Sequence, residues 1–253
     1  MSDRGFIYDI RRKMQVLAFD IFGPKIMSKL YFKIVLKQNL NLDNPKTFNE
    51  KIQWYKLNYC PQHKLIITCT DKYRVREYLE KKGLLEYQVP LLGVWERVED
   101  IKWNELPNKF VLKGNHGCAY NIICNDKETF DIPAAIKKLK RWLKEDFGKF
   151  NAEIHYSKIK PCIICEKFIE SDNKALVDYK IHCFNGEPRF VLICSERNLN
   201  HYNRNYYDIN WNKLKYARDI KGDFEKPDSF NEMLRIRKNI SFMKIGLEKN
   251  LWK

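Results

Sequence analysis

Two short apolar runs that each end in a charged residue constrain the fold of this chain most strongly. Residues 110–112 lead into Lys113, and a turn of small residues follows at positions 114–119. Further along the chain, residues 163–165 lead into Glu166. Short apolar runs bounded by turn residues are typical of buried strands. A lysine beside a glycine-containing turn suits a phosphate, and a glutamate that ends a buried strand suits an adenine. Together the two runs predict a nucleotide held between two sheets.

The composition is that of a basic, folded protein. The 253 residues are 44% hydrophobic and 14% aromatic, which is enough for one large domain or two small ones. The net charge of +15 favours polyanionic partners, although scattered lysines on a solvated surface explain the same excess. The sequence carries no nucleic-acid motif, so no nucleic-acid partner is expected. The N-terminal apolar runs are too short to span a membrane and lack a cleavage site, which predicts a cytoplasmic protein.

The eight cysteines fit a reduced protein better than a metal-binding one. Cys162 and Cys165 have a spacing found in zinc and redox sites. However, residues three apart on a strand face opposite sides, and no second pair of Cys or His completes four ligands. The sequence therefore identifies no metal ligands. Most of the thiols lie in apolar runs, as buried free cysteines do: Cys60, Cys69, Cys118, Cys124, Cys162, Cys165, Cys183 and Cys194.

The first sixty residues are expected to form a helical region ahead of the rest of the chain. Residues 1–42 mix apolar and basic residues and predict one or two amphipathic helices, broken near Gly23-Pro24. Their apolar faces suit core packing or, alternatively, an anionic membrane surface. Residues 47–50, Thr-Phe-Asn-Glu, form a capping box and predict the start of a further helix.

Residues 61–253 combine helices and strands without strict alternation, which predicts an α+β fold. One helix is expected from Asp71 to Lys81-Lys82-Gly83, and another is expected to begin at Asp131. Strands are expected near 89–95, at 110–113 with 122–124 as its hairpin partner, at 162–169 and at 189–195.

The segment 176–184 is predicted to be a strand that ends in a hairpin turn at Asn185-Gly186. Its polar face could line a cleft, with Lys180 on a phosphate and Asp178 on an amine or a metal; alternatively, it is the solvated face of a half-buried hairpin. The alternation places Val177, Tyr179, Ile181 and Cys183 on one face and Asp178, Lys180, His182 and Phe184 on the other.

Lys113 and Glu166 each allow a second interpretation. The charge of Lys113 would be costly if buried alone, so it should meet an anion, and Gly114 and Gly117 would let backbone N–H groups approach a phosphate. Alternatively, Lys113 is an exposed lysine at a hairpin turn. Glu166 could accept a hydrogen bond from an adenine amino group, or it could be an edge-strand carboxylate paired with a nearby lysine.

Four segments carry a resemblance to a known family: Asn44–Trp54, Asp71–Tyr78, Phe110–Gly117 and Asp178–Pro188. Within them, Pro-Lys-Thr-Phe-Asn-Glu-Lys and Phe-Val-Leu-Lys-Gly-Asn-His-Gly are specific when they occur together. On these motifs the chain resembles the TupA-like ATP-grasp proteins of bacterial capsule and cell-surface polysaccharide biosynthesis, from about residue 30 to about residue 236.

The resemblance implies an ATP-grasp fold, in which two α+β subdomains clamp ATP. It further implies a ligase that phosphorylates a carboxylate with ATP and Mg²⁺ and lets an amine attack the acyl phosphate. A glycan or carboxylate acceptor would be the second partner, and the protein would be cytoplasmic or peripheral at the inner membrane surface. Lys113, Lys180 and Asp178 are the implied catalytic residues. The implied ATP-binding residues are Lys72, Lys113, Gly114, His116, Gly117, Cys118, Ala119, Glu166, Lys167, Phe168 and Ile169.

Two departures from the family pattern affect these expectations. The family loop usually reads Asn-His-Gly-Ser-Gly, whereas Cys118 and Ala119 occupy the last two positions here. If that last position needs a positive φ, Ala119 costs about 1 kcal/mol or more. The family also continues after residues 230–234 with strands whose acidic residues resemble Mg²⁺ ligands, whereas Glu248 is the one acidic residue after Glu232 here. We therefore expect a truncated C-terminus without the metal-binding strands, and catalytic competence is open.

Two other functional classes fit parts of the sequence. A glycosyltransferase of the same pathway is one alternative, although no clear Asp-x-Asp motif for a nucleotide sugar is present. A non-catalytic protein that binds polyanions through its basic surface is the other.

Overall fold

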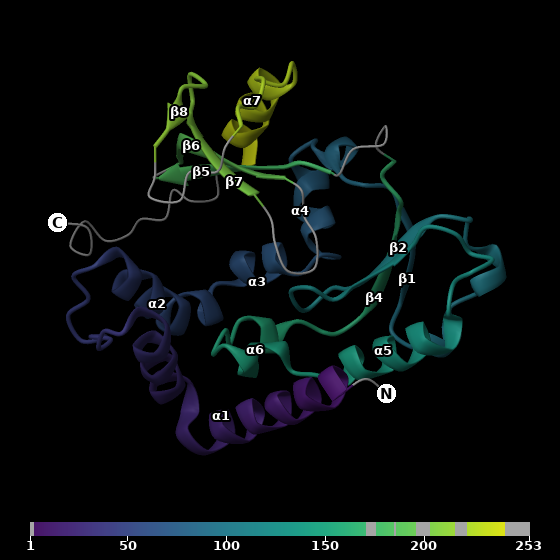
Figure 1. Ribbon diagram of the computed structural model, residues 1–253, viewed down its shortest axis with the longest axis horizontal. Coiled ribbons are helices and arrows are strands. Elements are labelled where there is room, and N and C mark those ends of the chain that lie inside the picture. Colours follow the sequence, from purple (N-terminus) through teal and green to yellow (C-terminus); the bar gives the residue numbers. More distant parts are fainter. Residues whose placement is uncertain (1–2, 171–175, 185, 196–202, 216–221, 241–253) are drawn as a thin grey trace. The chain divides into compact units, whose positions relative to one another are not determined.

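The computed structural model describes residues 3–170, 176–184, 186–195, 203–215 and 222–240 (Figure 1). The chain divides into two compact units, Met1–Phe168 and Ile169–Lys253. The predicted boundary between residues 60 and 61 lies within the first unit, and it stays a prediction. None of the described helices combines the length and hydrophobicity that crossing a bilayer requires.

The first unit begins with helices, as predicted. Helix α1 (Asp3–Leu36) is interrupted at Gly23, whose φ of 72° is not helical, so the predicted break is confirmed. Helix α2 (Phe48–Asn58) begins with the predicted capping box between Thr47 and Glu50. Helices α3 (Lys64–Thr70) and α4 (Val75–Lys81) follow.

Asp71 differs from the expectation that it begins a helix. Its Oδ1 accepts from the backbone N–H groups of Tyr73 (2.9 Å) and Arg74 (3.2 Å), and the helix proper starts at Val75. The carboxylate therefore orders the turn that leads into α4, because it satisfies amide groups that have no partner within the helix.

A four-stranded antiparallel sheet forms the centre of the first unit, in the order β1-β4-β2-β3. Helices α5 and α6 follow β3 in the chain (Figure 1), and Asp131 caps α5 as predicted. The bounds are β1 (Leu91–Trp95), β2 (Phe110–Gly114), β3 (Asn121–Cys124), β4 (Ile163–Lys167), α5 (Ile132–Lys144) and α6 (Phe147–Phe150). Short 3-10 helices cover Cys60–Gln62, Leu85–Tyr87, Val98–Asp100, Trp103–Glu105 and Tyr156–Lys158.

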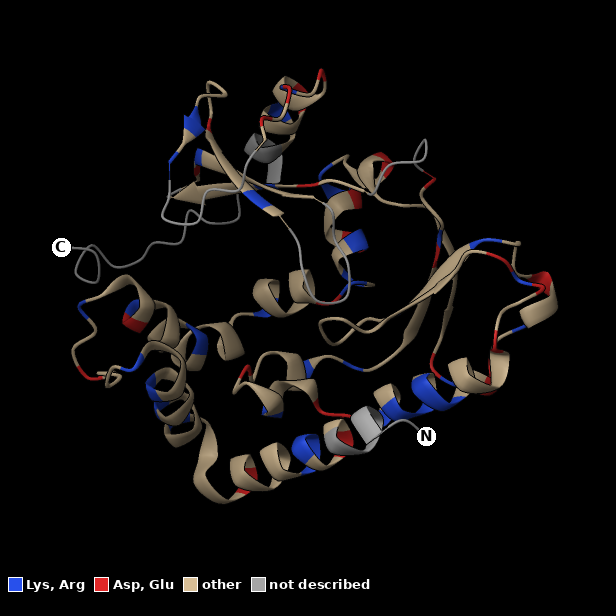
Figure 2. Cartoon of the chain, viewed as in Figure 1, with Lys and Arg blue, Asp and Glu red and all other residues tan. Residues whose placement is uncertain are grey.

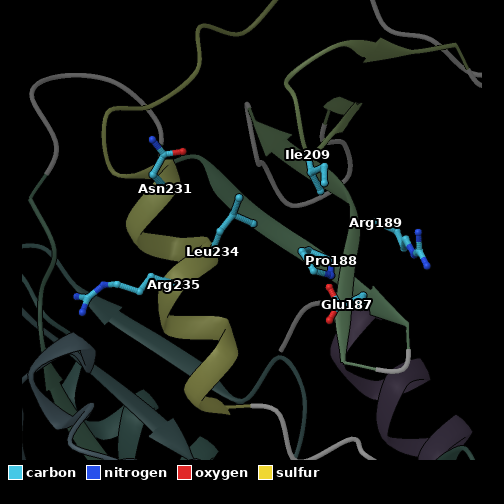
Figure 3. Close-up of a pocket in the computed structure, with 7 residues that line it drawn as sticks. All are labelled: Glu187, Pro188, Arg189, Ile209, Asn231, Leu234 and Arg235. Atoms are coloured by element: carbon cyan, nitrogen blue, oxygen red, sulfur yellow. The ribbon is translucent and has the colours of Figure 1, made fainter.

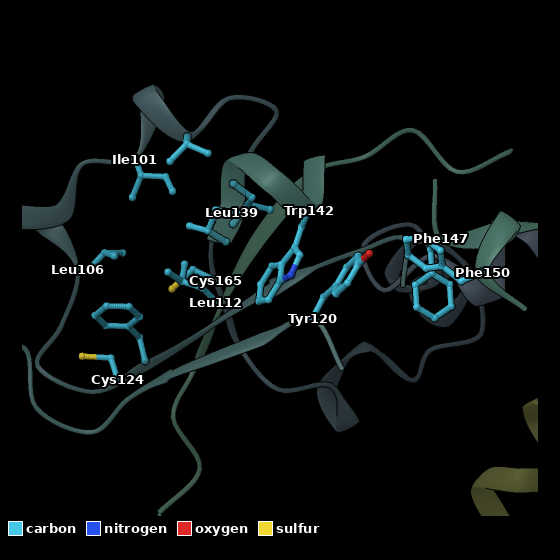
Figure 4. Close-up of a cluster of buried hydrophobic side chains, with 13 residues drawn as sticks. Ile101, Leu106, Leu112, Tyr120, Cys124, Leu139, Trp142, Phe147, Phe150 and Cys165 are labelled. Carbon is cyan, nitrogen blue, oxygen red and sulfur yellow. The ribbon is translucent and has the colours of Figure 1, made fainter. Parts of the chain in front are cut away.

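The core of this unit fills the space between the sheet and α5 (Figure 4). Phe110 and Leu112 are fully buried on one face of β2, and Leu139 of α5 is fully buried with them. Tyr120 stacks on Trp142 with ring centroids 4.9 Å apart. Since alternate residues of a strand face opposite sides, this packing directs Val111 and Lys113 to the other face of the sheet.

The second unit contains a four-stranded antiparallel sheet, in the order β5-β6-β7-β8, and helix α7. Val191, Ile193, Tyr207 and Phe230 are its buried core. Because α7 packs on the face that carries this core, the polar face of β5 points away from α7. The bounds are β5 (Asp178–Phe184), β6 (Glu187–Ser195), β7 (Asn203–Asp208), β8 (Lys213–Leu214) and α7 (Phe230–Ile240).

One prediction for β5 is wrong. Val177, Tyr179 and Ile181 pack against the core as expected, but Cys183 is exposed. The pairing with β6 is irregular at this point, because His182 pairs with Phe190 and Cys183 pairs with Pro188, which leaves Arg189 of β6 without a register partner among the described residues of β5.

Candidate functional site

A cluster of three cations and one carboxylate lies on the face of the first sheet opposite the core. Lys113 Nζ lies 2.5 Å from Glu166 Oε2, and Arg76 Nη2 of α4 lies 3.2 Å from Glu166 Oε1. Glu166 is 7% exposed, and its strand β4 is an inner strand of the sheet. Lys113 thus meets an anion as predicted, and Glu166 is paired with a lysine without being on a sheet edge.

Lys72 is the third cation of this cluster. Its Nζ donates to the carbonyl oxygens of Gly114 (3.4 Å) and Gly117, both in the turn after β2. Burial lowers the pKa of Lys72, and the charges of Lys113 and Glu166 act on it in opposite directions. The cluster of Lys72, Arg76, Lys113 and Glu166 carries a net positive charge, which suits a bound phosphate group.

The turn after β2 is held in place by the side chain of Asn115. Its Oδ1 accepts from the N–H of Cys162 (2.7 Å), and its Nδ2 donates to Asp71 Oδ1 and to the carbonyl of Lys160, both at 3.0 Å. Asn115 and Asp71 are each 1% exposed. This buried network joins the turn after β2, the turn before α4 and the start of β4, which are the segments that carry Lys113, Lys72 and Glu166.

His116 is an anchor of the same turn. Its Nε2 donates to the carbonyl oxygen of Trp142 at 2.8 Å, and the ring is almost fully buried. Burial lowers the pKa of His116. The side chain is thus directed into the protein. If His116 binds phosphate, it would do so through its backbone and not through its imidazole ring.

Gly114 and Gly117 are required by packing. A Cβ at Gly117 would lie 2.7 Å from Tyr120 Cε2 and 2.8 Å from Phe147 Cδ2, and a Cβ at Gly114 would lie 3.0 Å from Tyr120 Cδ2. Both backbones keep ordinary negative-φ geometry, in contrast to Gly23 and Gly83. The rings of Tyr120 and Phe147 therefore pack directly against the turn after β2.

Gly117→Ala is expected to destabilise the protein by about 1–3 kcal/mol, because the added methyl group overlaps two packed rings. Urea unfolding followed by tryptophan fluorescence measures this change. Cys118→Ala, at the neighbouring exposed position, is the control and should stay within about 0.5 kcal/mol of the wild type. Equal stability of Gly117→Ala and the control would contradict this packing.

Ala119 occupies the strained position of the turn. Its φ is 61°, in the left-handed region that favours glycine. Ala119, which replaces the second glycine of the family loop, therefore adopts the positive φ on which its expected energetic cost depends.

Ala119→Gly is expected to stabilise the protein by about 1 kcal/mol, because it relieves the strain of a Cβ at positive φ. Thermal unfolding is the measurement. Ala134→Gly on the exposed surface of α5 should shift stability in the opposite direction by a similar amount. A loss of stability in Ala119→Gly would show that the left-handed conformation costs nothing here.

The thiols of the region differ in their exposure. Cys118 is exposed and lies 3.4 Å from the hydroxyl of Tyr156. All eight cysteines are free and all lie within the described residues. Burial raises the pKa of Cys162 and of Cys165 to about 12, so both remain protonated near neutral pH.

The predicted adenine hinge lies where the two units meet in the chain. Glu166 and Lys167 end β4, Phe168 is the last residue of the first unit, and Ile169 is the first residue of the second. The N–H of Lys167 donates to the carbonyl of Pro90 at 2.9 Å. If Lys167 contacts the edge of an adenine, it would therefore do so through its backbone carbonyl, because its N–H already has a partner.

Asp178, Lys180 and His182 lie on one face of β5 in the second unit. They pair in register with Cys194, Leu192 and Phe190, respectively, ahead of the irregularity at Cys183. His182 stacks on Phe190 with ring centroids 4.4 Å apart. Burial, and then the charge of Lys180, lowers the pKa of His182. The predicted polar face of β5 is therefore present.

The second unit also contains a cavity of about 410 Å³, beside α7 and the β5–β6 turn (Figure 3). None of the predicted site residues lines it, so we do not assign it to the ATP site. Its lining residues are Glu187, Pro188, Arg189, Ile209, Asn231, Leu234 and Arg235.

The described residues fit ATP phosphates better than they fit a protein-bound metal ion. Lys72, Arg76 and Lys113 supply the cations that a triphosphate needs. Across the described part of the chain, no three His, Cys, Asp or Glu side chains converge to hold a metal. The predicted loss of Mg²⁺-binding strands concerns the end of the chain, and residues 241–253 lie outside the described residues.

Sequence reasoning placed Asn115 in the predicted phosphate loop but missed the role of its side chain, and it missed Arg76 and Asp71 as parts of the site. All three lie within the motif segments named above, but their roles depend on contacts across the fold. Arg76 contacts Glu166, which is 90 residues away in the sequence. Asn115 contacts Asp71, which is 44 residues away.

Comparison with known proteins identifies the family. Neither the curated proteins nor the solved structures searched include a match to this chain. The family model described as TupA-like ATPgrasp matches residues 50–246, which include the cation cluster, the turn after β2 and the strands of both sheets. On this match, together with two antiparallel sheets and an N-terminal helical region, the chain belongs to the TupA-like ATP-grasp family.

Proposed function

We propose that this protein is an ATP-dependent carboxylate–amine ligase of bacterial cell-surface polysaccharide biosynthesis. The observation that carries the proposal is the net positive cluster of Lys72, Arg76 and Lys113 around the buried carboxylate of Glu166, beside the glycine-containing turn. Membership of the ATP-grasp family supports ATP as the nucleotide. The acceptor, a glycan or another carboxylate, and the cytoplasmic location are parts of the same proposal.

The reaction would proceed in two steps. An acceptor carboxylate oxygen attacks the γ-phosphorus of ATP, and the bond from that phosphorus to the β,γ-bridging oxygen breaks to release ADP. An amine then attacks the carbonyl carbon of the acyl phosphate, and the carbon–oxygen bond breaks to release inorganic phosphate. The amine gives up a proton as the amide forms.

The residues of the first unit would act mainly by neutralising charge. Lys113 and Lys72 would bind phosphate oxygens and stabilise the charge that develops on the transferred group. The network of Asn115 and Asp71 would keep both lysines in place without touching substrate. Glu166 would keep the cations in position through its two ion pairs.

Asp178 and Lys180 are proposed to act at the acceptor end of the reaction. Lys180 is an exposed cation suited to a phosphate or carboxylate, and Asp178 is a carboxylate on the same strand face, suited to an amine. Among the described residues, no three His, Cys, Asp or Glu side chains come together to hold Mg²⁺, so these proposed roles involve no protein-bound metal.

Two measurements test the proposal. Calorimetry with Mg·ATP should show saturable binding, which a protein without a nucleotide site would not show. ATP labelled with ¹⁸O in the β,γ-bridge should scramble its label when a cognate carboxylate is added without an amine, because reversible acyl-phosphate formation frees the β-phosphate to rotate. Binding without carboxylate-dependent exchange, or stable transfer of the phosphoryl group to a hydroxyl, would contradict the ligase assignment.

A further inference from the structure

A continuous apolar stripe lies exposed on the first half of α1. Ile10, Met14, Leu17 and Ile21 follow one another at intervals of four, three and four residues, which places them on one side of a helix. Met14, Leu17 and Ile21 are 65%, 61% and 65% exposed. Large apolar side chains that gather at helical spacing on a surface indicate an interaction site.

The opposite side of this helix is already packed against the first unit. Val16 contacts the core between the sheet and α5, and Phe19 contacts a second buried cluster around Met27. The guanidinium of Arg12 lies 3.9 Å from the ring centre of Phe150. The orientation of α1 is thus fixed, and its apolar stripe must face away from the core.

A second set of exposed apolar side chains follows the break at Gly23. Ile26, Leu30 and Ile34 are exposed at intervals of four residues, whereas Met27 and Phe32 are buried. Exposed lysines accompany this second set at positions 25, 29, 33 and 37. The second half of α1 therefore presents apolar and cationic side chains together.

The basic side chains of α1 are not neutralised by Asp9 and Asp20 of the same helix. Asp9 and Asp20 are both paired with the body of the unit: Asp9 with Arg141 (3.1 Å) and Asp20 with Lys149 (2.6 Å). Residues 11–37 carry seven basic residues: Arg11, Arg12, Lys13, Lys25, Lys29, Lys33 and Lys37. Figure 2 shows these cations on α1, and further cations on the adjacent α5.

We propose that the exposed face of α1 docks on the surface of a bilayer that contains anionic lipids. An interfacial helix buries its apolar stripe at the level of the headgroups while its Lys and Arg side chains pair with lipid phosphates. Both features are present, and the break at Gly23 joins two such segments. A second copy of the chain fits this face less well, because a symmetric interface would oppose the lysines of the two copies.

The test is flotation of the full chain with vesicles of phosphatidylcholine alone and of equimolar phosphatidylcholine and phosphatidylglycerol. We expect binding to the anionic vesicles and little to the neutral ones. Leu17→Glu should weaken partitioning about tenfold or more, because it places a charge in the stripe. The triple variant Lys25→Gln, Lys29→Gln, Lys33→Gln should weaken it on the order of 100-fold.

Leu85→Glu is the matched control, because Leu85 is also an exposed leucine of the first unit but lies outside α1. It should bind vesicles like the wild type. The proposal is overturned if anionic vesicles do not bind the chain, or if Leu17→Glu and Leu85→Glu behave alike. A dimer in analytical ultracentrifugation that Leu17→Glu dissociates would also overturn it. Because no nucleotide is needed, the outcome is independent of the proposed ligase activity.

Discussion

Asn115→Ala is expected to lower the free energy of unfolding by about 3 kcal/mol or more. The substitution removes the hydrogen bonds of this side chain to Cys162, Asp71 and Lys160, and it leaves the buried N–H of Cys162 and the carboxylate of Asp71 short of a partner. Each buried polar group left unsatisfied costs about 1–3 kcal/mol, and a charged one costs more. Urea unfolding monitored by circular dichroism measures the loss.

An exposed asparagine provides the control for this prediction. Asn104→Ala, on the surface of the same unit, should change the stability by no more than about 0.5 kcal/mol. If Asn115→Ala were as stable as Asn104→Ala, the network would not hold the turn, and the proposed positioning of Lys72 and Lys113 would lose its basis.

Lys113→Ala is expected to weaken Mg·ATP binding about 100-fold. A hydrogen bond to a charged group contributes about 1.5–3 kcal/mol, and the upper part of that range corresponds to roughly two orders of magnitude in affinity. The substitution also leaves Glu166 with Arg76 alone, so the cluster loses net positive charge. Isothermal titration calorimetry with Mg·ATP gives the affinity directly.

Lys144→Ala on the exposed surface of α5 controls for the loss of one positive charge and should retain wild-type affinity. Thermal unfolding of Lys113→Ala separates a local loss of binding from general destabilisation, since the ion pair with Glu166 is also lost. Unchanged ATP affinity in a folded Lys113→Ala variant would place the nucleotide elsewhere on the protein.

Local sequence signals predicted much of the fold. The capping box at Thr47, the cap at Asp131 and the break at Gly23 each depend on residues within one or two helical turns of the feature itself. The apolar run before Lys113 likewise identified a buried strand, because its period and its bounding turn residues are contained in one short segment.

Features that depend on distant contacts could not be predicted in the same way. The network of Asn115 and Asp71 joins two turns and the start of β4, and the residues around Asn115 in the sequence do not indicate that Asp71 is its partner. The exposure of Cys183 results from a register irregularity that a regular alternation cannot indicate. The prediction that Gly117 lets the backbone approach a phosphate stays a prediction, and the sequence did not indicate that the rings of Tyr120 and Phe147 also require a glycine there.

The pairing of Glu166 with both Lys113 and Arg76 has a consequence for anion selectivity. Any anion that approaches these cations must compete with a carboxylate that is already in place and cannot diffuse away. We expect a singly or doubly charged ion such as sulfate to compete less well with this carboxylate than a more highly charged anion does. A triphosphate contacts several cations at once and can share them with the carboxylate. If this cluster is the phosphate site, as proposed, we expect Glu166 to favour multiply charged phosphates over small anions.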